Sequence, residues 1–390
     1  MWQKTLLKSV LVTTMSLGTV ACGAMETAQA PDDTAMDPPV LSVGETPRLQ
    51  QMLAALPDDR IVFVGESHTR YDHHLVQLEV LKFLHRRHGD VALGVEWFQT
   101  PAQPALDDYL AGRITEAQML DRSGYFDRWR FDYRLYRPII EYAKHNGIPI
   151  IALNAPVELT RKIGQDGLGA LPADERATLP AEYGPVKEGY RTRVKAAFDA
   201  HPPQGQSFDH FFEVMQTWDE TMAQRAADHL AAHPGRRMVV LAGSGHVMYG
   251  DGIPDRLERR TGIRGTRLLV GAELVGEADV ADFIVLSREQ VLPPAGKLGA
   301  FLDTTGDSVK VQGLVDDSPL KPVGVGEGDV IVAIDGIPTP TFADLKLALL
   351  DKAPGDKVTV RYRSAGWLSG EDEDSVEIAL GGETPPMMHR

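Results

Sequence analysis

The stretch "RIVFVGESHTRYDHHLVQLEVLKFLHRRHGDVALGVE", residues 60–96, decides the fold. It begins with "RIVFVG" and ends with "VALGVE", two short apolar runs typical of strands that are buried on both faces of a parallel sheet. Between them, Leu75, Leu78 and Leu81 follow helical spacing, and Gly89 marks the end of the predicted helix. A strand, a helix and a second strand in this order indicate an α/β fold.

The same alternation continues along the chain. Further apolar runs stand at 148–154, 237–243, 266–271 and 282–287, with helical stretches between most of them. We therefore predict an open, mostly parallel sheet with helices on both faces over residues 48–290. A chain of 390 residues has room for a second domain.

Polar side chains follow four of these runs directly. In open parallel sheets, ligands bind outside the carboxyl ends of the strands, so these side chains should share one rim. Glycines in "GESH" and "GSGH" let the chain turn sharply there, so that each histidine points back over the sheet. The residues expected at this rim are Glu66, His68, Glu96, Asn154 and His246.

Two chemistries suit this set of side chains. A divalent metal with an open coordination position would take Glu66, His68 and His246 as ligands. A metal-free acid–base site would use a carboxylate to orient a histidine. The catalytic candidates are Glu66, His68, Glu96 and His246. The structural alternative is that these are polar turn residues that satisfy strand ends.

Five segments resemble the ChaN family of haem-binding lipoproteins: "GESHTRYDHHLVQLEVL", "GVEWFQ", "WRFDYRLYRPIIEYAKHNGIPIIALNAP", "MQTWDETMAQ" and "LAGSGHVMYGDGIPDRL". The family is grouped with the Tiki/TraB metalloproteases and the erythromycin esterases. The resemblance covers about residues 48–290, whereas 155–207 match no family motif. It implies haem as the ligand, a role in haem or iron acquisition, and active-site positions at Glu66, His68, Glu96 and His246.

An aromatic stripe is compatible with haem. Trp129, Tyr133 and Tyr136 fall at helical spacing and are surrounded by arginines that could pair with propionates, while Tyr or His could ligate iron. Packing of this stripe on the sheet is the alternative. The predicted cofactor contacts are His73, His74, Trp129, Tyr133, Tyr136 and Asn154. For His73 and His74, which open a helix, a solvated or structural role competes with this one.

Two further side chains come from the stretch "DHFFEVMQTWDETMAQRAADHLAAHPG". Gln216 and Asp219 either lean toward the rim or face solvent, whereas Met222 suits core packing. The absence of a C-x-x-C-H motif excludes covalent haem attachment.

Residues 296–382 have a different character, with short alternating runs and turns. Through "GEGDVIVAIDGIP" they resemble a bacterial PDZ domain, a small β-rich α+β fold. The loop "LGAF" matches the carboxylate-binding loop of that family, so the predicted peptide-binding residues are Leu298, Gly299, Ala300 and Phe301. Consecutive backbone N–H groups would capture the C-terminus of a protein partner there. A PDZ fold used only as a spacer or for dimerisation is the alternative.

The first residues resemble a bacterial lipoprotein signal. Lys4 and Lys8 precede the apolar stretch "SVLVTTMSLGTVA", which predicts a signal peptide over residues 1–22. Cys22 would then be the lipidated first residue of the mature chain, although Thr19 stands where such signals usually carry Leu. A cleaved secretory signal with an incidental cysteine is the alternative.

The predicted location is the cell envelope. Gly23 follows the cysteine and favours a lipid anchor in the outer membrane, facing the periplasm. Residues 23–47 form a Pro- and Asp-rich tether, and 383–390 an unstructured tail. A formal net charge of −15 argues against nucleic acid as a partner.

We therefore expect a membrane-anchored lipoprotein that binds haem or an iron compound for uptake and recruits a protein through its PDZ module. The alternative function is a metal-dependent hydrolase, a peptidase or esterase. A third reading is a non-catalytic scaffold in which only the PDZ module acts. The sequence does not decide whether the protein forms a homodimer, in which an exposed aromatic face could hold haem between two protomers.

Overall fold

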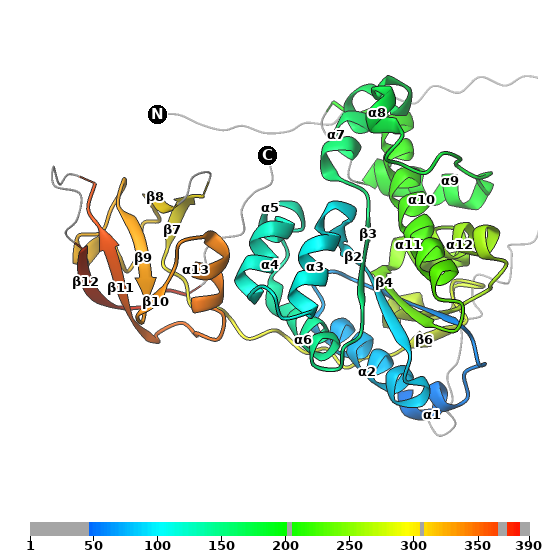
Figure 1. Ribbon diagram of the computed structural model, residues 1–390, viewed down its shortest axis with the longest axis horizontal. Helices are drawn as coiled ribbons and strands as arrows, with labels where there is room; N and C mark the ends of the chain where they lie inside the picture. Colours follow the sequence, from blue (N-terminus) through cyan, green and yellow to red (C-terminus); the bar gives the residue numbers. More distant parts are fainter. Residues whose placement is uncertain (1–46, 201–204, 305–307, 366–372, 383–390) are drawn as a thin grey trace, which may run out of the picture. The chain divides into compact units, whose positions relative to one another are not determined.

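The computed structural model describes residues 47–200, 205–304, 308–365 and 373–382 (Figure 1). The predicted signal peptide with Cys22, nearly all of the tether and the tail lie outside the described residues. Within the described residues, no helix combines the length and the apolar character needed to cross a bilayer.

Six parallel strands form the sheet of the first domain, in the order β3-β2-β4-β1-β5-β6. Every pair of neighbours in this sheet is parallel, which confirms the predicted open parallel sheet. The strands are β1 (Ile61–Glu66), β2 (Val91–Gln99), β3 (Ile150–Asn154), β4 (Arg237–Gly243), β5 (Thr266–Val270) and β6 (Phe283–Val285).

Helices cover both faces of this sheet, as β1 illustrates. Val62 and Val64 enter one core with side chains of α2 and α6, whereas Ile61 and Phe63 enter a second core with α10 and α12. Burial on both faces explains why these strands are continuous apolar runs. The α-helices are α1 (Leu49–Ala54), α2 (Tyr71–His88), α3 (Gln103–Leu110), α4 (Glu116–Ser123), α5 (Tyr125–Arg128), α6 (Arg137–His145), α7 (Val157–Asp166), α8 (Ala173–Arg176), α9 (Glu188–Ala200), α10 (Phe208–Ala232), α11 (Ser244–Val247) and α12 (Ile253–Thr261).

The aromatic segment does not form the helix that its spacing predicts. The helix α5 ends at Arg128, and Arg130 has a φ of 66°, a left-handed conformation that stops helix propagation. A single 3₁₀ turn, η3 (Tyr133–Leu135), then leads into α6. The stripe of aromatic side chains is therefore divided between a bend and a 3₁₀ turn.

The segment without a family motif is largely helical. It contains α7, η4 (Leu168–Ala170), α8 and α9, and it packs on α10. Ile163 of α7 and Val214 of α10 share one small core, while Tyr190 of α9 and Phe212 of α10 share another. The remaining 3₁₀ turns of the domain are η2 (Thr100–Ala102), η5 (Met248–Gly250) and η6 (Ala272–Leu274).

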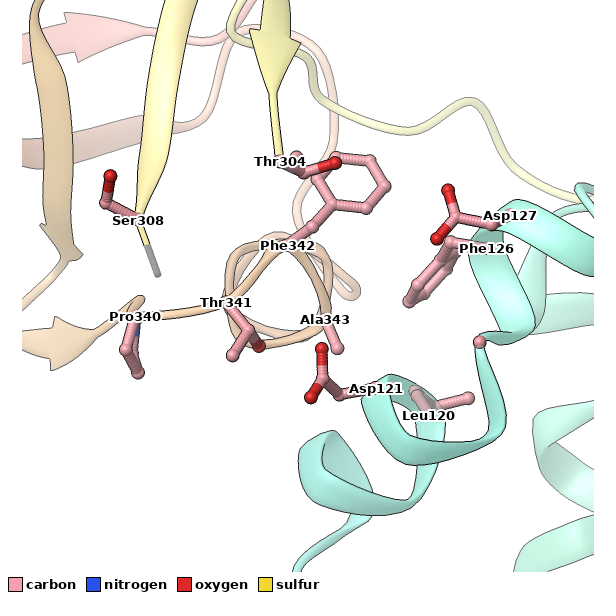
Figure 2. A pocket seen from close by; sticks show the side chains of 11 residues that line it. Leu120, Asp121, Phe126, Asp127, Thr304, Ser308, Pro340, Thr341, Phe342 and Ala343 are labelled. Atoms are coloured by element: carbon pink, nitrogen blue, oxygen red, sulfur yellow. The ribbon is translucent and has the colours of Figure 1, made fainter. Parts of the chain in front are cut away.

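An antiparallel sheet in the order β12-β11-β9-β8-β7, with β10 paired to β9, and one helix make up the C-terminal module. Thr341 caps the helix by accepting a hydrogen bond from the backbone N–H of Asp344; Figure 2 shows this first turn and a pocket beside it. The elements are β7 (Ala300–Asp303), β8 (Val309–Leu314), η7 (Lys321–Val323), β9 (Val330–Ile334), β10 (Ile337–Pro338), α13 (Phe342–Ala348), β11 (Lys357–Arg363) and β12 (Glu373–Ala379).

Candidate functional site

The carboxyl ends of three neighbouring strands meet at one rim. Glu66 ends β1 and lies opposite Gly243, which ends β4. On the other side of β4, Val95 of β2 pairs with Leu241. Glu96 is the next residue of β2 and therefore lies near the same edge of the sheet as Glu66. His68 and His246 come from the turns after β1 and β4. The predicted convergence of two acidic groups and two imidazoles is therefore present.

The first pair of the site is Glu66 and His68. The Nδ1–H of His68 donates to Oε1 of Glu66 across 2.5 Å. Burial alone lowers the pKa of His68, but this hydrogen bond and the charges of Glu96 and Glu66 outweigh it, so the pKa lies above its ordinary value. The carboxylate is buried, whereas the His68 side chain is 30% exposed. This pair therefore presents one imidazole to solvent with its inner nitrogen fixed.

Aromatic side chains and a glycine surround the exposed imidazole. The ring centroids of Trp129 and Phe131 lie 4.9 and 5.0 Å from that of His68. On another side, a Cβ added to Gly243 would lie 3.1 Å from Nε2 of His68, so the ring rests close against the glycine backbone. No hydrogen bond to Nε2 of His68 occurs within the described residues. The outer nitrogen is thus available to a ligand.

The second pair is Glu96 and His246. Oε2 of Glu96 accepts the backbone N–H of Gly243 at 2.6 Å, and Oε1 lies 3.4 Å from Nε2 of His246. Burial raises the pKa of Glu96, but the charge and hydrogen bond of His246, the charge of His68 and the N–H of Gly243 together outweigh it and lower the pKa to about 2. The carboxylate is therefore ionised at neutral pH and faces the rim.

His246 is held between two carboxylates. Its Nδ1–H donates to Oδ1 of Asp219 at 2.6 Å, while Nε2 faces Glu96. Burial lowers the pKa of His246, but the two negative charges outweigh it and raise the pKa to about 10. The ring is therefore an imidazolium at neutral pH, and only 7% of the residue is exposed.

His73 and His74 lie in the first turn of α2 and are buried against the turn that follows β1. Nδ1 of His73 accepts the backbone N–H of Ser67 at 3.1 Å. The two ring nitrogens of His74 contact Oε1 of Gln77 at 3.0 Å and the carbonyl of His68 at 3.1 Å. Each histidine is only 1% exposed, so neither reaches a surface on which a cofactor could bind. Their predicted cofactor role is replaced by a structural one: they hold the turn that carries His68.

Three other predicted cofactor contacts are also interior groups. The hydroxyl of Tyr133 donates to Glu116 at 2.8 Å, in a fully buried position. Tyr136 is likewise buried, and its hydroxyl donates to the carbonyl of His68 at 3.3 Å. The amide oxygen of Asn154 accepts the backbone N–H of Ala155. Of the predicted stripe, Trp129 alone lies beside His68 with partial exposure.

The arginines around the stripe are mostly paired already. Arg128 binds Glu158 at 2.6 Å, Arg134 binds Asp132 at 2.7 Å, and Arg137 binds Glu116 at 2.9 Å. Arg130 is exposed, with its Nε bound to the carbonyl of Asp127. The expectation that these arginines pair with propionates therefore applies to Arg130 alone.

The predicted metal ligands lie at one rim, but their nitrogen and oxygen atoms are paired with one another and do not face a common point. Among the residues that the structure describes, no group of three His, Cys, Asp or Glu side chains could hold a metal ion. Nδ1 of His68 is bound to Glu66, and both nitrogens of His246 face carboxylates. The geometry therefore favours ionic pairs over a divalent metal coordinated by Glu66, His68 and His246.

The site also contains residues that the sequence patterns did not identify. Phe131 packs on His68, and Tyr190 and Arg256 lie behind Asp219. The one signal was that Asp219 and Glu220 stand between Trp218 and Met222, two apolar residues suited to the buried side of the helix. Gln216, by contrast, makes no contact with the rim that the structure records.

The LGAF loop leads into an edge strand of the second sheet. Leu298 is buried and Phe301 is 52% exposed, while Ala300 opens β7, the last strand in the sheet order. Gly299 has a φ of 67°, which favours glycine, and its carbonyl accepts the N–H of Val315. Among the strands that the structure describes, β7 pairs with β8 alone, and an edge position after a glycine turn suits an added peptide strand.

Comparison with known proteins assigns a family to each of the two domains. The family model for haem-binding uptake proteins of the Tiki superfamily, ChaN, matches residues 52–257, and a PDZ domain model matches residues 296–380. A curated relative, Protein RETICULATA-RELATED 5, chloroplastic, of Arabidopsis thaliana, is 28% identical over 251 residues. The match covers 58% of this chain and 34% of the relative, so the chain spans about a third of the relative's length.

Two solved structures are also similar to parts of the chain. One, of cofacial haem binding to ChaN of Campylobacter jejuni, is 16% identical with a TM-score of 0.49 and covers 62% of this chain and 92% of that chain. The other is the PDZ domain of a carboxy-terminal protease from Vibrio cholerae in complex with peptide. It is 21% identical with a TM-score of 0.20 and covers 23% of this chain and 98% of that chain. By its family model, which spans more than half of its length, the chain belongs to the ChaN family of haem-binding uptake proteins and carries a PDZ domain.

Proposed function

We propose that the α/β domain binds haem at the rim around His68 for haem or iron acquisition. The observation that carries this proposal is the outer nitrogen of His68, which is partly exposed and has no hydrogen-bond partner among the described residues. Haem supplies an iron atom that an imidazole nitrogen can ligate. Family membership supports haem as the ligand class.

The residues around His68 fit a haem in three respects. Glu66 accepts Nδ1–H, which leaves the lone pair of Nε2 pointing outward and makes the ring a stronger ligand. Trp129 and Phe131 provide apolar surface for the porphyrin beside it. Finally, Arg130 is an exposed cation next to Trp129 in the chain, and a haem propionate is an anion that could pair with it.

Tyr249 offers a second donor atom of a type that binds haem iron. It is partly exposed, has a φ of 58°, and carries the guanidinium of Arg193 4.2 Å from its ring centroid. A backbone conformation of this kind in a non-glycine residue is typical of functional sites. His68 is the primary candidate because its own carboxylate partner and aromatic walls surround it.

A hemin titration followed at the Soret band tests this function. We expect saturable binding at a fixed stoichiometry by the wild-type protein, a large loss of affinity in His68→Ala, and wild-type behaviour in His145→Ala. His145 is a matched control because it is an exposed histidine on α6. If Tyr249→Phe lost hemin affinity while His68→Ala kept it, the iron ligand would be the phenol oxygen of Tyr249 instead of His68. Non-saturating uptake by the wild type would rule the function out.

The location and the partner belong to the same proposal. We propose that Cys22 is lipidated and anchors the protein in the outer membrane, facing the periplasm, and that the PDZ domain holds the C-terminus of a protein partner. The signal-like pattern before Cys22 supports the first point, and the open edge of β7 supports the second. Substitution Cys22→Ser should release the protein from the membrane fraction, and unchanged fractionation would contradict lipidation.

A second candidate function is hydrolysis by acid–base catalysis. Two imidazole–carboxylate pairs, Glu66 with His68 and Asp219 with His246, end at the same rim. In such a reaction, Nε2 of His68 would take a proton from water, and Glu66 would stabilise the imidazolium that forms. Hydrolysis of a chromogenic ester should then depend on His68, and equal rates for wild type and His68→Ala would exclude this activity.

A further inference from the structure

Asp219 occupies an unusual position in the middle of α10. Aspartate is a weak helix former, and a carboxylate without exposure is costly unless it is fully paired. Both oxygens of Asp219 have partners. Oδ1 accepts Nδ1–H of His246 at 2.6 Å, and Oδ2 accepts the hydroxyl of Tyr190 at 2.6 Å. The carboxylate therefore connects α9, α10 and the turn after β4.

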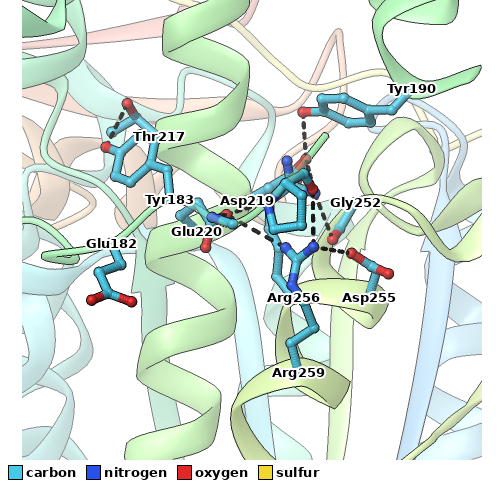
Figure 3. Close-up of polar contacts among 12 residues, drawn as sticks. Glu182, Tyr183, Tyr190, Thr217, Asp219, Glu220, Gly252, Asp255, Arg256 and Arg259 are labelled. Atoms are coloured by element: carbon cyan, nitrogen blue, oxygen red, sulfur yellow. Dashed lines mark hydrogen bonds and ion pairs between the residues drawn. The ribbon is translucent and has the colours of Figure 1, made fainter. Parts of the chain in front are cut away.

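Arg256 of α12 supports this carboxylate from behind. Its Nη1 lies 3.8 Å from Oδ2 of Asp219, and its Nε lies 3.1 Å from Oε1 of Glu220. The same guanidinium donates to the carbonyls of Asp251 and Gly252 and lies 4.7 Å from the ring centroid of Tyr190. Figure 3 shows the contacts of Tyr190 and Arg256 converging on Asp219. Since Arg256 is 2% exposed, the support is rigid.

Asp219 affects the rim by setting the orientation of the His246 ring. With Nδ1 bound to Asp219, the ring can only place Nε2 toward Glu96, 3.4 Å away. Glu96 in turn accepts the N–H of Gly243, the residue against which His68 rests. His246 lies in the one-turn helix α11, whose backbone fixes where the side chain begins but not how its ring is turned. The orientation is imposed from α10.

We propose that Asp219 is a positioning residue, which fixes His246 at the rim while Tyr190 and Arg256 fix Asp219. It contacts no surface on which a ligand could bind, because it is fully buried, and so it acts only through the imidazole. The affinity part of this inference rests on the proposed haem-binding function; the orientation part rests on the geometry alone. A purely structural ion pair would contribute to stability without governing the imidazole or the ligand.

The test compares variants by two measurements on the folded protein. Histidine side-chain NMR with ¹⁵N labelling detects the Nδ1–H proton of His246, assigned by its loss in His246→Gln. We expect this resonance to disappear in Asp219→Ala and to persist in Asp219→Asn, whose amide oxygen still accepts the bond. Hemin affinity should fall about tenfold in Asp219→Ala, as is usual for groups that orient a site imidazole. Asp228→Ala is the matched control, an exposed aspartate on the same helix.

Tyr190→Phe keeps the test decisive if Asp219→Ala does not fold. Removal of this hydroxyl leaves Oδ2 of Asp219 with Arg256 alone, so the His246 resonance should shift while the protein stays folded. An unshifted resonance in Tyr190→Phe, or a folded Asp219→Ala with the resonance and hemin affinity of the wild type, would overturn the proposal. If the wild type binds no hemin saturably, the proposed function fails, and the NMR result still decides whether Asp219 positions His246.

Discussion

Replacement of Gly243 by Ala is a direct perturbation of the rim. The added Cβ would lie 2.9 Å from Cε1 and 3.1 Å from Nε2 of His68, and 3.6 Å from Oε2 of Glu96. The imidazole must therefore move by about 0.5 Å to reach the 3.4 Å at which ordinary contact begins. Gly245 is the matched control, because a Cβ there meets nothing within 4 Å and the residue is exposed.

The size of the effect follows from the bond that the movement disturbs. His68 donates to the carboxyl group of Glu66 across 2.5 Å, and a hydrogen bond of the imidazole–carboxylate type contributes about 1.5–3 kcal/mol. Since the His68 side chain is 30% exposed, the ring can turn into solvent, and we expect the free energy of unfolding to fall by less than ~1 kcal/mol. Hemin affinity should fall about tenfold, which corresponds to ~1.4 kcal/mol.

Hemin titration and urea unfolding of wild type, Gly243→Ala and Gly245→Ala provide the assay. Gly243→Ala should bind hemin more weakly than both other proteins while its unfolding midpoint stays close to theirs. Equal hemin affinity for the two glycine variants would refute the reasoning, since it would mean that the position of His68 against Gly243 does not matter for the ligand.

Three further predictions concern other parts of the molecule. The charges of Glu96 and Asp219 outweigh burial and raise the pKa of His246 to about 10, so its contribution to stability is complete below pH 6.5 and is lost as the pH rises toward 10. Over this range, the free energy of unfolding measured in urea should fall more for the wild type than for His246→Gln. Arg256→Met should lower the free energy of unfolding by about 3 kcal/mol, because it removes the buried cation that Asp219 and Glu220 share, and a thermal melt that matches the wild type would contradict this. Gly299→Ala should weaken binding of a peptide with a free C-terminus, measured by fluorescence polarisation, because Gly299 has a φ of 67° and a Cβ there would lie 3.0 Å from Cα of Ser318; Gly326→Ala, where a Cβ meets nothing within 4 Å, is its control.

The parallel sheet could be predicted because its strands obey a local rule. Each is short, continuous and rich in Val, Ile or Leu, which is what burial on both faces requires. The rim followed from topology, since residues directly after parallel strands must meet at one edge. Glu66, His68, Glu96 and His246 were found in this way, from their places at strand ends rather than from their chemistry alone.

The aromatic segment shows where periodicity fails. Trp129, Tyr133 and Tyr136 have helical spacing, but Arg130 adopts a left-handed conformation that no residue pattern announced. Tyr133 and Tyr136 instead became core groups with hydroxyl partners at Glu116 and at the carbonyl of His68. Residues at helical spacing lie on one face only when a single continuous helix contains all of them.

The support behind His246 depends on contacts between distant residues. Asp219 meets its partners 27 and 29 positions away in the sequence, His246 and Tyr190. Such pairings arise from the packing of α9, α10 and α12, so no local motif could define them. The two adjacent carboxylates between Trp218 and Met222 were the one visible sign that cations had to lie near them in the interior.

An iron-edge anomalous difference map of crystals grown with hemin is the most direct measurement of the central claim. We expect one iron peak per bound haem in front of Nε2 of His68, with the porphyrin against Trp129 and Phe131. An iron peak at any other surface of the α/β domain would contradict it, whatever the affinity measured in solution.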